Sequence, residues 1–340
     1  MTANDADCRP LLAVTIGDPA GIGPEITLGA LANTVLFERC RPLVIGDRRI
    51  LERAAGWLGL HAPTFEIIDT PSSGEYLAGT VPLLDMANAS PDECPPGQVT
   101  AVAGNAAVQY IFRACDLAMD GAVDGIVTGP INKASINAAG HHYAGHTELL
   151  AERTSADRVS MLLTSDNLKV VHVSTHVALE EAIRRVTAKR VREVIGLADE
   201  SCRALGIEQP RIAVAGLNPH ASEGGLFGDQ EAREIQPAIA LARKDGVNVT
   251  DPQPPDTVFL RAVQGHYDIV VAMYHDQGHI PMKLLAFDSG VNVSIGLPII
   301  RTSVDHGTAF DIAGTGQANS ESMTAAIDVA IQMARARRTA

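Results

Sequence analysis

The sequence predicts a two-lobed α/β protein, built on a mostly parallel sheet with helices on both faces. Its 340 residues exceed what one minimal core needs. Short apolar runs recur along the chain, and runs this apolar are typical of strands buried on both faces. They are "LLAVTI" (11–16), "PLVIG" (42–46), "GIVTG" (125–129), "RIAVAGL" (211–217) and "DIVVAMY" (268–274). Helical patterns separate them, and such alternation places helices on both sides of a parallel sheet.

Two helices and one hairpin can be bounded from the pattern. The second helix is expected from Thr187 to Leu205. Runs 158–165 and 168–175, separated by Asp166-Asn167, predict an antiparallel hairpin. The segment 69–98 is rich in Pro, Gly and Ser, which predicts a loop or lid at a lobe boundary. The first helix carries an apolar stripe at helical spacing, formed by Val108, Ile111, Phe112, Cys115 and Met119.

The charge balance excludes nucleic acid as a general partner. Lys and Arg number 27 against 40 Asp and Glu, a formal net charge of −13. An anionic small substrate stays possible, because local cations and helix N-termini can outweigh the global field.

Cysteine usage and the apolar pattern predict a cytoplasmic protein. The five cysteines form no CxxC pair, so neither a zinc knuckle nor a disulfide framework is expected. The N-terminal stretch lacks the basic start and apolar core of a signal peptide. No apolar run reaches the roughly 18 residues of a membrane span, so we expect no membrane partner.

Three histidines each follow the end of an apolar run: His176 after "VVHVST", His220 in "LNPH" and His275 in "AMYH". Ligands of open α/β sheets bind beyond the carboxyl ends of the strands, where these side chains would meet. Three imidazoles with an open fourth position describe a catalytic metal site. The alternative is that each is an isolated surface or hydrogen-bonded histidine.

A second group of polar residues suits a phosphate or carboxylate, the arginine through a bidentate fork. Taken singly, Lys283 and Arg301 also fit solvated surface charges. The group comprises His146 and Thr147 in "AGHTELL", Lys283, Asn292 and Arg301.

Two glycine-rich stretches permit close backbone approach to a ligand. "GDPAGIGPE" (17–25) follows the first strand, and its Pro24 and Glu25 fit a helix start. It matches neither the dinucleotide fingerprint nor the phosphate loop of ATPases, so a tight turn explains it equally well. "DHGTAFDIAGTGQAN" (305–319) is either a long turn or a loop beside a flat ligand.

Taken together and in order, these motifs resemble the 4-hydroxythreonine-4-phosphate dehydrogenase family. The resemblance runs from residue 17 to 316 and rests on "GDPAGIGPE", "TGPINK", "GHTELL", "NPHASEGG", "PPDT", "YHDQG" and "GVNVSIGLPIIRTSVDHGTA". Residues 306–319 also look like the adenine-nucleotide loop of isopropylmalate and isocitrate dehydrogenases. The resemblance implies their two-lobed fold, with an interlobe active-site cleft, and a homodimer with active sites near the subunit interface.

The implied lobes are intertwined in one dehydrogenase unit spanning 1–340. Residues of about 10–130 with 280–340 would form the nucleotide side, and about 131–279 the metal and dimer side. The implied cofactors are NAD or NADP and one divalent metal per site, Zn²⁺ first, with Co²⁺, Mn²⁺ or Mg²⁺ as alternatives.

The family's site residues carry over position by position. Its metal ligands fall on His176, His220 and His275. Its substrate contacts fall on His146, Thr147, Lys283, Asn292 and Arg301. Asp256 in "PPDT" matches an acidic residue near the site, and the candidates for the base are Lys283, Asp256 or a relayed water. The nucleotide loop implies cofactor contacts from His306, Gly307, Thr308, Asp311 and Asn319.

Two departures from the family pattern bear on function. Ser222 replaces a usual glycine, which would cost strain if the backbone there is left-handed. His279-Ile280-Pro281 replaces the Leu-Pro of the vitamin B6 branch and looks like a sister branch that acts on D-threonate or D-erythronate 4-phosphate.

The resemblance implies oxidation of a 4-phosphorylated hydroxy acid to the 3-keto acid, followed by decarboxylation. One alternative is a cis-dihydrodiol dehydrogenase of an aromatic acid, a third relative. A rival from another class is a metal-dependent phosphohydrolase or a phosphate-binding protein, because His176 with His275-Asp276 superficially matches HD-type hydrolases. That fold is all-helical, whereas these residues follow strands.

Overall fold

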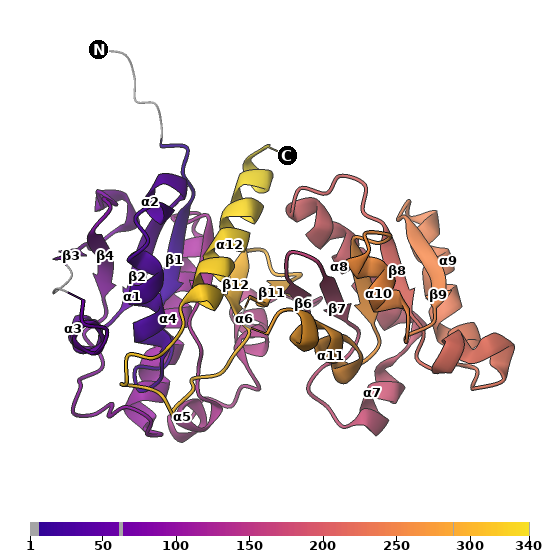
Figure 1. Ribbon diagram of the computed structural model, residues 1–340, viewed down its shortest axis with the longest axis horizontal. Helices are drawn as coiled ribbons and strands as arrows, with labels where there is room; N and C mark the ends of the chain where they lie inside the picture. The colour runs from indigo at the N-terminus through magenta and orange to yellow at the C-terminus, as the bar shows by residue number, and fades with distance from the viewer. Residues whose placement is uncertain (1–6, 61–63, 288, 340) are drawn as a thin grey trace, which may run out of the picture. The chain divides into compact units, whose positions relative to one another are not determined.

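The computed structural model describes residues 7–60, 64–287 and 289–339, and the chain forms two compact units (Figure 1). Unit 1 comprises residues up to 156 with 297–338, and unit 2 comprises 157–296. The boundaries differ from those expected near 130 and 280. Residues 131–156 stay in unit 1 because their helices pack against its long helix, and 280–296 stay in unit 2 because they end in a strand of its sheet.

Unit 1 is built on a parallel sheet, as the apolar runs predict. Its order is β3-β4-β2-β1-β5-β12, and every neighbouring pair is parallel. Strands β1, β2, β5 and β12 are buried almost throughout. The strands are β1 (Leu11–Thr15), β2 (Arg41–Gly46), β3 (Thr64–Ile67), β4 (Thr80–Asp85), β5 (Gly125–Thr128) and β12 (Arg301–Val304).

Helices cover both faces of this sheet. From β1 the chain adds β2 and then the outer strands on one side, and it later adds β5 on the other side of β1. Because such crossovers are right-handed, the reversal of direction places the early helices on one face of the sheet and α4 on the other. Helix α4 packs against β1, β2 and β5, with α5 and α6 beside it. The helices are α1 (Gly23–Leu31), α2 (Leu36–Arg39), α3 (Arg48–Trp57), α4 (Ala101–Met119), α5 (Lys133–Ala138), α6 (His146–Thr154), α12 (Glu321–Thr339) and the short η1 (Pro71–Ser73).

The expectation of a loop or lid at 69–98 is wrong in part, because the segment contains β4 between β2 and β3. Pro82 concealed this strand, since proline is rare in the interior of a sheet. The apolar residues Val81, Leu83 and Leu84 are buried, and their packing overrides the local signal.

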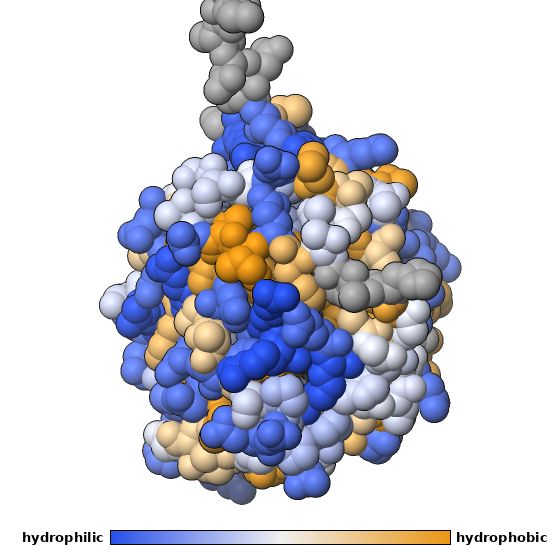
Figure 2. Space-filling view, turned by 90° about the vertical axis from the view of Figure 1, so that its left-hand side faces the viewer, coloured by the Kyte–Doolittle hydropathy of each residue, from blue (hydrophilic) through white to orange (hydrophobic). Residues whose placement is uncertain are grey.

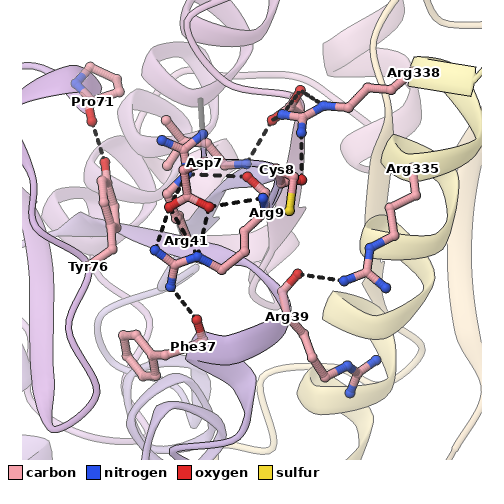
Figure 3. A network of polar contacts seen from close by, with 12 residues as sticks. Asp7, Cys8, Arg9, Phe37, Arg39, Arg41, Pro71, Tyr76, Arg335 and Arg338 are labelled. Atoms are coloured by element: carbon pink, nitrogen blue, oxygen red, sulfur yellow. Dashed lines mark hydrogen bonds and ion pairs between the residues drawn. The ribbon is translucent and has the colours of Figure 1, made fainter. Parts of the chain in front are cut away.

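Polar contacts attach the first described residues to unit 1 (Figure 3). Arg9 pairs with Asp7 and donates to the carbonyl of Phe37. Arg338 on α12 donates to the carbonyl of Cys8 and pairs with Asp124. Figure 2 shows the side of the molecule on which β3 and α3 lie, where apolar side chains are scattered among more numerous hydrophilic ones.

Unit 2 has a mixed sheet in the order β11-β6-β7-β10-β8-β9. The predicted hairpin is confirmed, because β6 and β7 pair antiparallel, and β11 continues antiparallel on β6. The remaining pairs are parallel. The strands are β6 (Ser160–Thr164), β7 (Lys169–His172), β8 (Ile212–Ala215), β9 (Val249–Gln253), β10 (Ile269–Ala272) and β11 (Val291–Ile295).

The two faces of this sheet carry different helices. Val170, Val270 and Ala272 face a core that contains Phe259 of α10 and Met282 of α11. Alternate residues face α8, which packs against β10 and α9. The helical segments are α7 (Leu179–Arg185), α8 (Ala188–Ala204), η2 (Pro219–Gly225), η3 (Glu231–Ile235), α9 (Gln236–Lys244), α10 (Val258–Val263) and α11 (His275–Leu285).

The predicted helix from Thr187 to Leu205 corresponds to α8, which begins where the Thr187 hydroxyl accepts a hydrogen bond from the Arg190 amide at 3.3 Å. Within the described residues, no helix is long and apolar enough to cross a membrane.

Candidate active site

A buried guanidinium marks the first part of the site, in unit 1. Arg301 opens β12 and is only 2% exposed. It donates to the Thr128 hydroxyl at the end of β5, from Nε at 3.1 Å and from the terminal nitrogen at 2.7 Å. Burial lowers the pKa of Arg301 to about 9, and the nearby Glu148 carboxylate opposes this shift. The side chain remains a cation at neutral pH, so a desolvated positive charge lies beside the first turn of α6.

His146 and Thr147 begin α6 after the extended Gly145. The Nε2 atom of His146 is buried and has no hydrogen-bond partner. Burial, and secondarily the positive charge of Arg301, hold the pKa of His146 well below its usual value. The structure therefore brings together three of the predicted substrate residues, His146, Thr147 and Arg301. His146 supplies a neutral imidazole, His146 and Thr147 form the start of a helix, and Arg301 is the buried cation beside it.

The two glycine-rich loops of unit 1 pack against each other. Glu25 is 1% exposed, and its carboxylate accepts from the Gly314 amide at 3.0 Å and the Gly316 amide at 2.8 Å. The Ile22 amide donates to the carbonyl of Thr308 at 3.0 Å. A β-carbon on Gly21 would lie 2.9 Å from Thr308, so glycine is needed for this approach. The first loop thus holds the predicted nucleotide loop in place.

The predicted cofactor residues belong to this loop, residues 305–319, which the contacts of Glu25 and Ile22 anchor. Thr308 is buried, whereas His306, Gly307, Asp311 and Asn319 are exposed to solvent. Asn319 accepts from the Glu321 amide at 2.9 Å and so helps to start α12. Exposed side chains on a fixed loop are accessible to a ligand.

Two of the predicted metal ligands lie together in unit 2. The rings of His176 and His275 have centroids 5.4 Å apart. His176 follows β7, and His275 is the first residue of α11, directly beyond β10, which pairs with β7. Nδ1 of His275 lies 2.7 Å from the Asp276 carboxylate, which favours the tautomer whose Nε2 carries the lone pair.

The third predicted ligand, His220, lies on a left-handed turn. Residues 220–224 all have positive φ, and Ser222 has φ 68°. The condition stated for strain at Ser222 is met, because its backbone is left-handed and its side chain carries a β-carbon. Asn218, just before the turn in the chain, anchors it. The backbone amide and the side-chain amide of Asn218 donate to the buried Glu231 carboxylate at 2.7 and 2.9 Å.

The fit of a metal ion rests on the first two histidines. Two imidazoles bound to one tetrahedral ion through bonds of about 2 Å have centroids roughly 5 Å apart, close to the distance seen here. His220 has its ring near Phe227, with centroids 6.1 Å apart. Among the residues the structure describes, no three His, Cys, Asp or Glu side chains are grouped to hold an ion. The spacing of His176 and His275 suits a shared ion, and all three ligands stay predictions.

The remaining predicted residues lie in unit 2, on α11, on β11 and in the turn before α10. Lys283 lies in the last turn of α11, with Nζ 5.5 Å from the Phe287 ring centroid. Asn292 on β11 donates to the sulfur of Met161 at 2.9 Å, on the sheet face that α11 covers. Asp256 is exposed in the turn between β9 and α10.

Sequence reasoning missed several residues that organise these groups. Gln277 accepts from the Met273 amide at 2.7 Å and donates to the Gly216 carbonyl at 2.8 Å, which joins the ends of β10 and β8. His172 and His279 lie against the predicted ligands. The sequence analysis names His279 only as part of a departure from the family pattern and does not predict its contact with His275. Spacing was a further signal, because His172 and His279 each stand four residues from a predicted ligand.

Comparisons with known proteins identify a family and several similar proteins. Residues 38–330 match the family described as "Pyridoxal phosphate biosynthetic protein PdxA". A 4-hydroxythreonine-4-phosphate dehydrogenase from Desulfosudis oleivorans is 52% identical, over 96% of this chain and 96% of that protein. A D-threonate 4-phosphate dehydrogenase from Salmonella typhimurium is 50% identical, over 95% of this chain and 98% of its own length.

A solved structure shares the fold. The crystal structure of a 4-hydroxythreonine-4-phosphate dehydrogenase from Klebsiella pneumoniae aligns with a TM-score of 0.88 and 48% identity, over 96% of this chain and 99% of that one. Fold, motifs and near-complete coverage agree. The chain therefore belongs to the PdxA family and is an oxidoreductase of that family.

Proposed function

We propose that the protein is an NAD(P)-linked dehydrogenase that oxidises a 4-phosphorylated hydroxy acid to the 3-keto acid, which then loses CO2. The hydride leaves the hydroxyl-bearing carbon for the nicotinamide, and the hydroxyl proton passes to a base. The 3-keto acid is a β-keto acid, so loss of CO2 leaves an enolate that takes up a proton. The expected substrates are 4-phospho-D-threonate or 4-phospho-D-erythronate, ahead of 4-hydroxythreonine 4-phosphate.

The observation that carries this proposal is the buried Arg301 beside the start of α6. A guanidinium that is 2% exposed is costly to desolvate, and a bound dianion would compensate for that cost. His146 and Thr147 would add donors, with Asn292 and Lys283 as further substrate contacts. Anchoring the phosphate away from the reacting carbon supplies binding energy that orients the substrate.

The chain's own donors point to one divalent metal. His176 and His275 would hold it, with His220 as the expected third ligand, and zinc is the expected ion. When bound, such an ion would lower the pKa of the reacting hydroxyl and stabilise the negative charge that develops on loss of CO2. Lys283 or Asp256 is the proposed base.

The anchored loop at 305–319 is the proposed nucleotide contact, through His306, Gly307, Thr308, Asp311 and Asn319. Its attachment to Glu25 supports this role, because a fixed loop loses little entropy when a flat ligand binds. A phosphohydrolase or a pure phosphate-binding protein would have no use for such a loop.

We further propose that the protein acts as a cytoplasmic homodimer. Its five cysteines are free thiols, which suits a reducing compartment. On and just after α11 several large apolar side chains are exposed, which is typical of a surface that another subunit covers. These are Ile280 (56% exposed), Leu284 (82%), Leu285 (53%) and Phe287 (74%).

The proposed activity is tested by NADH formation with a divalent metal. The three phosphorylated acids are compared side by side, each against its unphosphorylated form, with CO2 measured in parallel. The proposal predicts one CO2 per NADH and a higher kcat/KM for the sugar acids than for the amino acid.

Other outcomes discriminate among the alternatives. Preference for 4-hydroxythreonine 4-phosphate would overturn the sugar-acid assignment alone. Activity only on an aromatic cis-diol would overturn the phosphorylated substrate, and release of inorganic phosphate without NADH would overturn the dehydrogenase assignment.

A further inference from the structure

Four imidazoles lie in succession in unit 2, and the proposed function uses only two of them. His176 and His275 are the proposed metal ligands. His279 and His172 continue the series, with ring centroids 3.6 Å from His275 to His279 and 4.7 Å from His279 to His172. Such a cluster outside the expected ligand set calls for a role of its own.

The contact between His275 and His279 is a parallel stack. The two residues are four apart on α11, so their side chains lie on the same helix face. Their ring planes differ by 12°, which leaves one face of the His275 ring covered by the His279 ring. Nδ1 of His279 lies 3.2 Å from the carbonyl of His275, so the covering ring is itself held to the helix.

His172 supports the stack from the sheet. It ends β7, is fully buried, and faces α11 on the same side of the sheet as Val170. Its ring fits only because residue 278 is glycine, since a β-carbon there would lie 2.3 Å from Nε2 of His172. The buried ring limits how far His279 can retreat from His275.

We infer that His279, backed by His172, is a positioning residue that fixes the ring plane of His275. The Asp276 carboxylate holds one edge of the His275 ring, and the stack holds one face. With both fixed, the ring keeps one orientation before any ligand arrives. Partners of this kind, one contact removed from a metal, typically contribute 10-fold to 100-fold to metal affinity. The consequence for metal binding rests on the proposed function, whereas the ring geometry does not.

The test uses the full-length protein with 13C-labelled histidine and three variants. His279→Ala removes the covering ring, whereas His279→Phe keeps a flat ring without the hydrogen bond to the carbonyl. Leu260→Ala is the control, at an exposed apolar position on α10 outside the proposed dimer surface. The readouts are the ring resonances of His275 without metal, Co²⁺ affinity from its visible absorption, and the split between kcat and KM.

The inference predicts that His279→Ala shifts the His275 ring resonance, by loss of the ring current, and weakens Co²⁺ binding about tenfold. His279→Phe should restore Co²⁺ affinity to within about threefold of the parent, on the same scale. Leu260→Ala should change neither the resonance nor the Co²⁺ affinity.

Two results would overturn the inference. One is an unchanged His275 resonance in folded His279→Ala. The other is a Phe variant that binds Co²⁺ as weakly as the Ala variant. Failure of the proposed function looks different, because the parent protein would then bind no Co²⁺ or form no NADH while the resonance shift persists.

Discussion

At the scale of single residues, the site combines strain and buried charge at positions that the sequence marks as functional. The left-handed turn at 220–224 holds His220, and Ser222 within it carries a β-carbon at φ 68°. The Nε2 atom of His146 and the side chain of Arg301 are withdrawn from water. Costs of this kind persist where the surrounding structure enforces them, and they concentrate at functional sites.

Ser222→Gly should stabilise the protein. Glycine adopts the left-handed conformation without the penalty of about 1–2 kcal/mol that a β-carbon carries, and its greater freedom in the unfolded chain offsets part of the gain. We expect an increase of about 0.5–1 kcal/mol in the free energy of unfolding, from urea denaturation. Ser174→Gly is the control, at a buried position outside the positive-φ region, and should destabilise. Equal losses in both variants would contradict the strain at Ser222.

His146 should make the protein sensitive to acid. Its pKa is lowered in the folded state, so the unfolded chain binds a proton that the folded chain does not. This contribution to stability is fully present above the usual pKa of 6.5 and declines as pH falls below it, by at most about 1.4 kcal/mol per pH unit. Below pH 6.5, the free energy of unfolding should therefore fall less steeply with decreasing pH in His146→Gln than in the parent protein. The control His142→Gln, at an exposed position, should keep the slope of the parent. Identical slopes in all three proteins would count against the buried neutral imidazole.

At the scale of elements, the proposed site is built on loops attached to the strand ends. The first glycine-rich loop holds the second through Glu25, and Gln277 joins the ends of β10 and β8. A loop so attached presents its backbone to a ligand in one arrangement.

Glu25→Gln tests the loop's proposed role. An amide nitrogen cannot accept from a backbone amide, so one of the two bonds to Gly314 and Gly316 would be lost. We expect the KM for NAD to rise about tenfold, equivalent to about 1.4 kcal/mol, with the KM for the acid nearly unchanged. Exposed Glu38→Gln is the control. If both KM values rise together, the loop does not act on the nucleotide selectively.

The sequence predicted the elements whose signal is local. The buried strands at 11–16, 42–46 and 125–129 and the hairpin at 158–175 carry their own apolar pattern, and the structure contains them. Strand β4 was missed because Pro82 argues against a strand until its packing is known. His172 and the ring contacts of His279 were missed for a related reason, since they depend on contact between a strand and a helix about 100 residues apart along the chain.

At the scale of the whole molecule, the proposed homodimer predicts a change in mass on mutation. Leu284 on α11 is 82% exposed, so the favourable free energy of burying its apolar surface is not gained unless a partner covers it. Leu284→Glu should shift the protein from dimer to monomer in sedimentation at micromolar concentration. Leu260→Glu, at a 58% exposed position on α10, should leave the dimer intact. A parent protein that sediments as a monomer would contradict the dimer directly.

The measurement that tests the central claim most directly is the dependence of NADH formation on the substrate phosphate, in the parent protein and in Arg301→Lys. Lysine keeps the charge but not the bidentate fork. The account predicts that the parent strongly prefers 4-phospho-D-threonate to D-threonate, and that Arg301→Lys reduces kcat/KM for the phosphorylated acid alone, by about 10-fold to 100-fold. Equal activity of the parent on both acids, or equal losses on both in the variant, would contradict it.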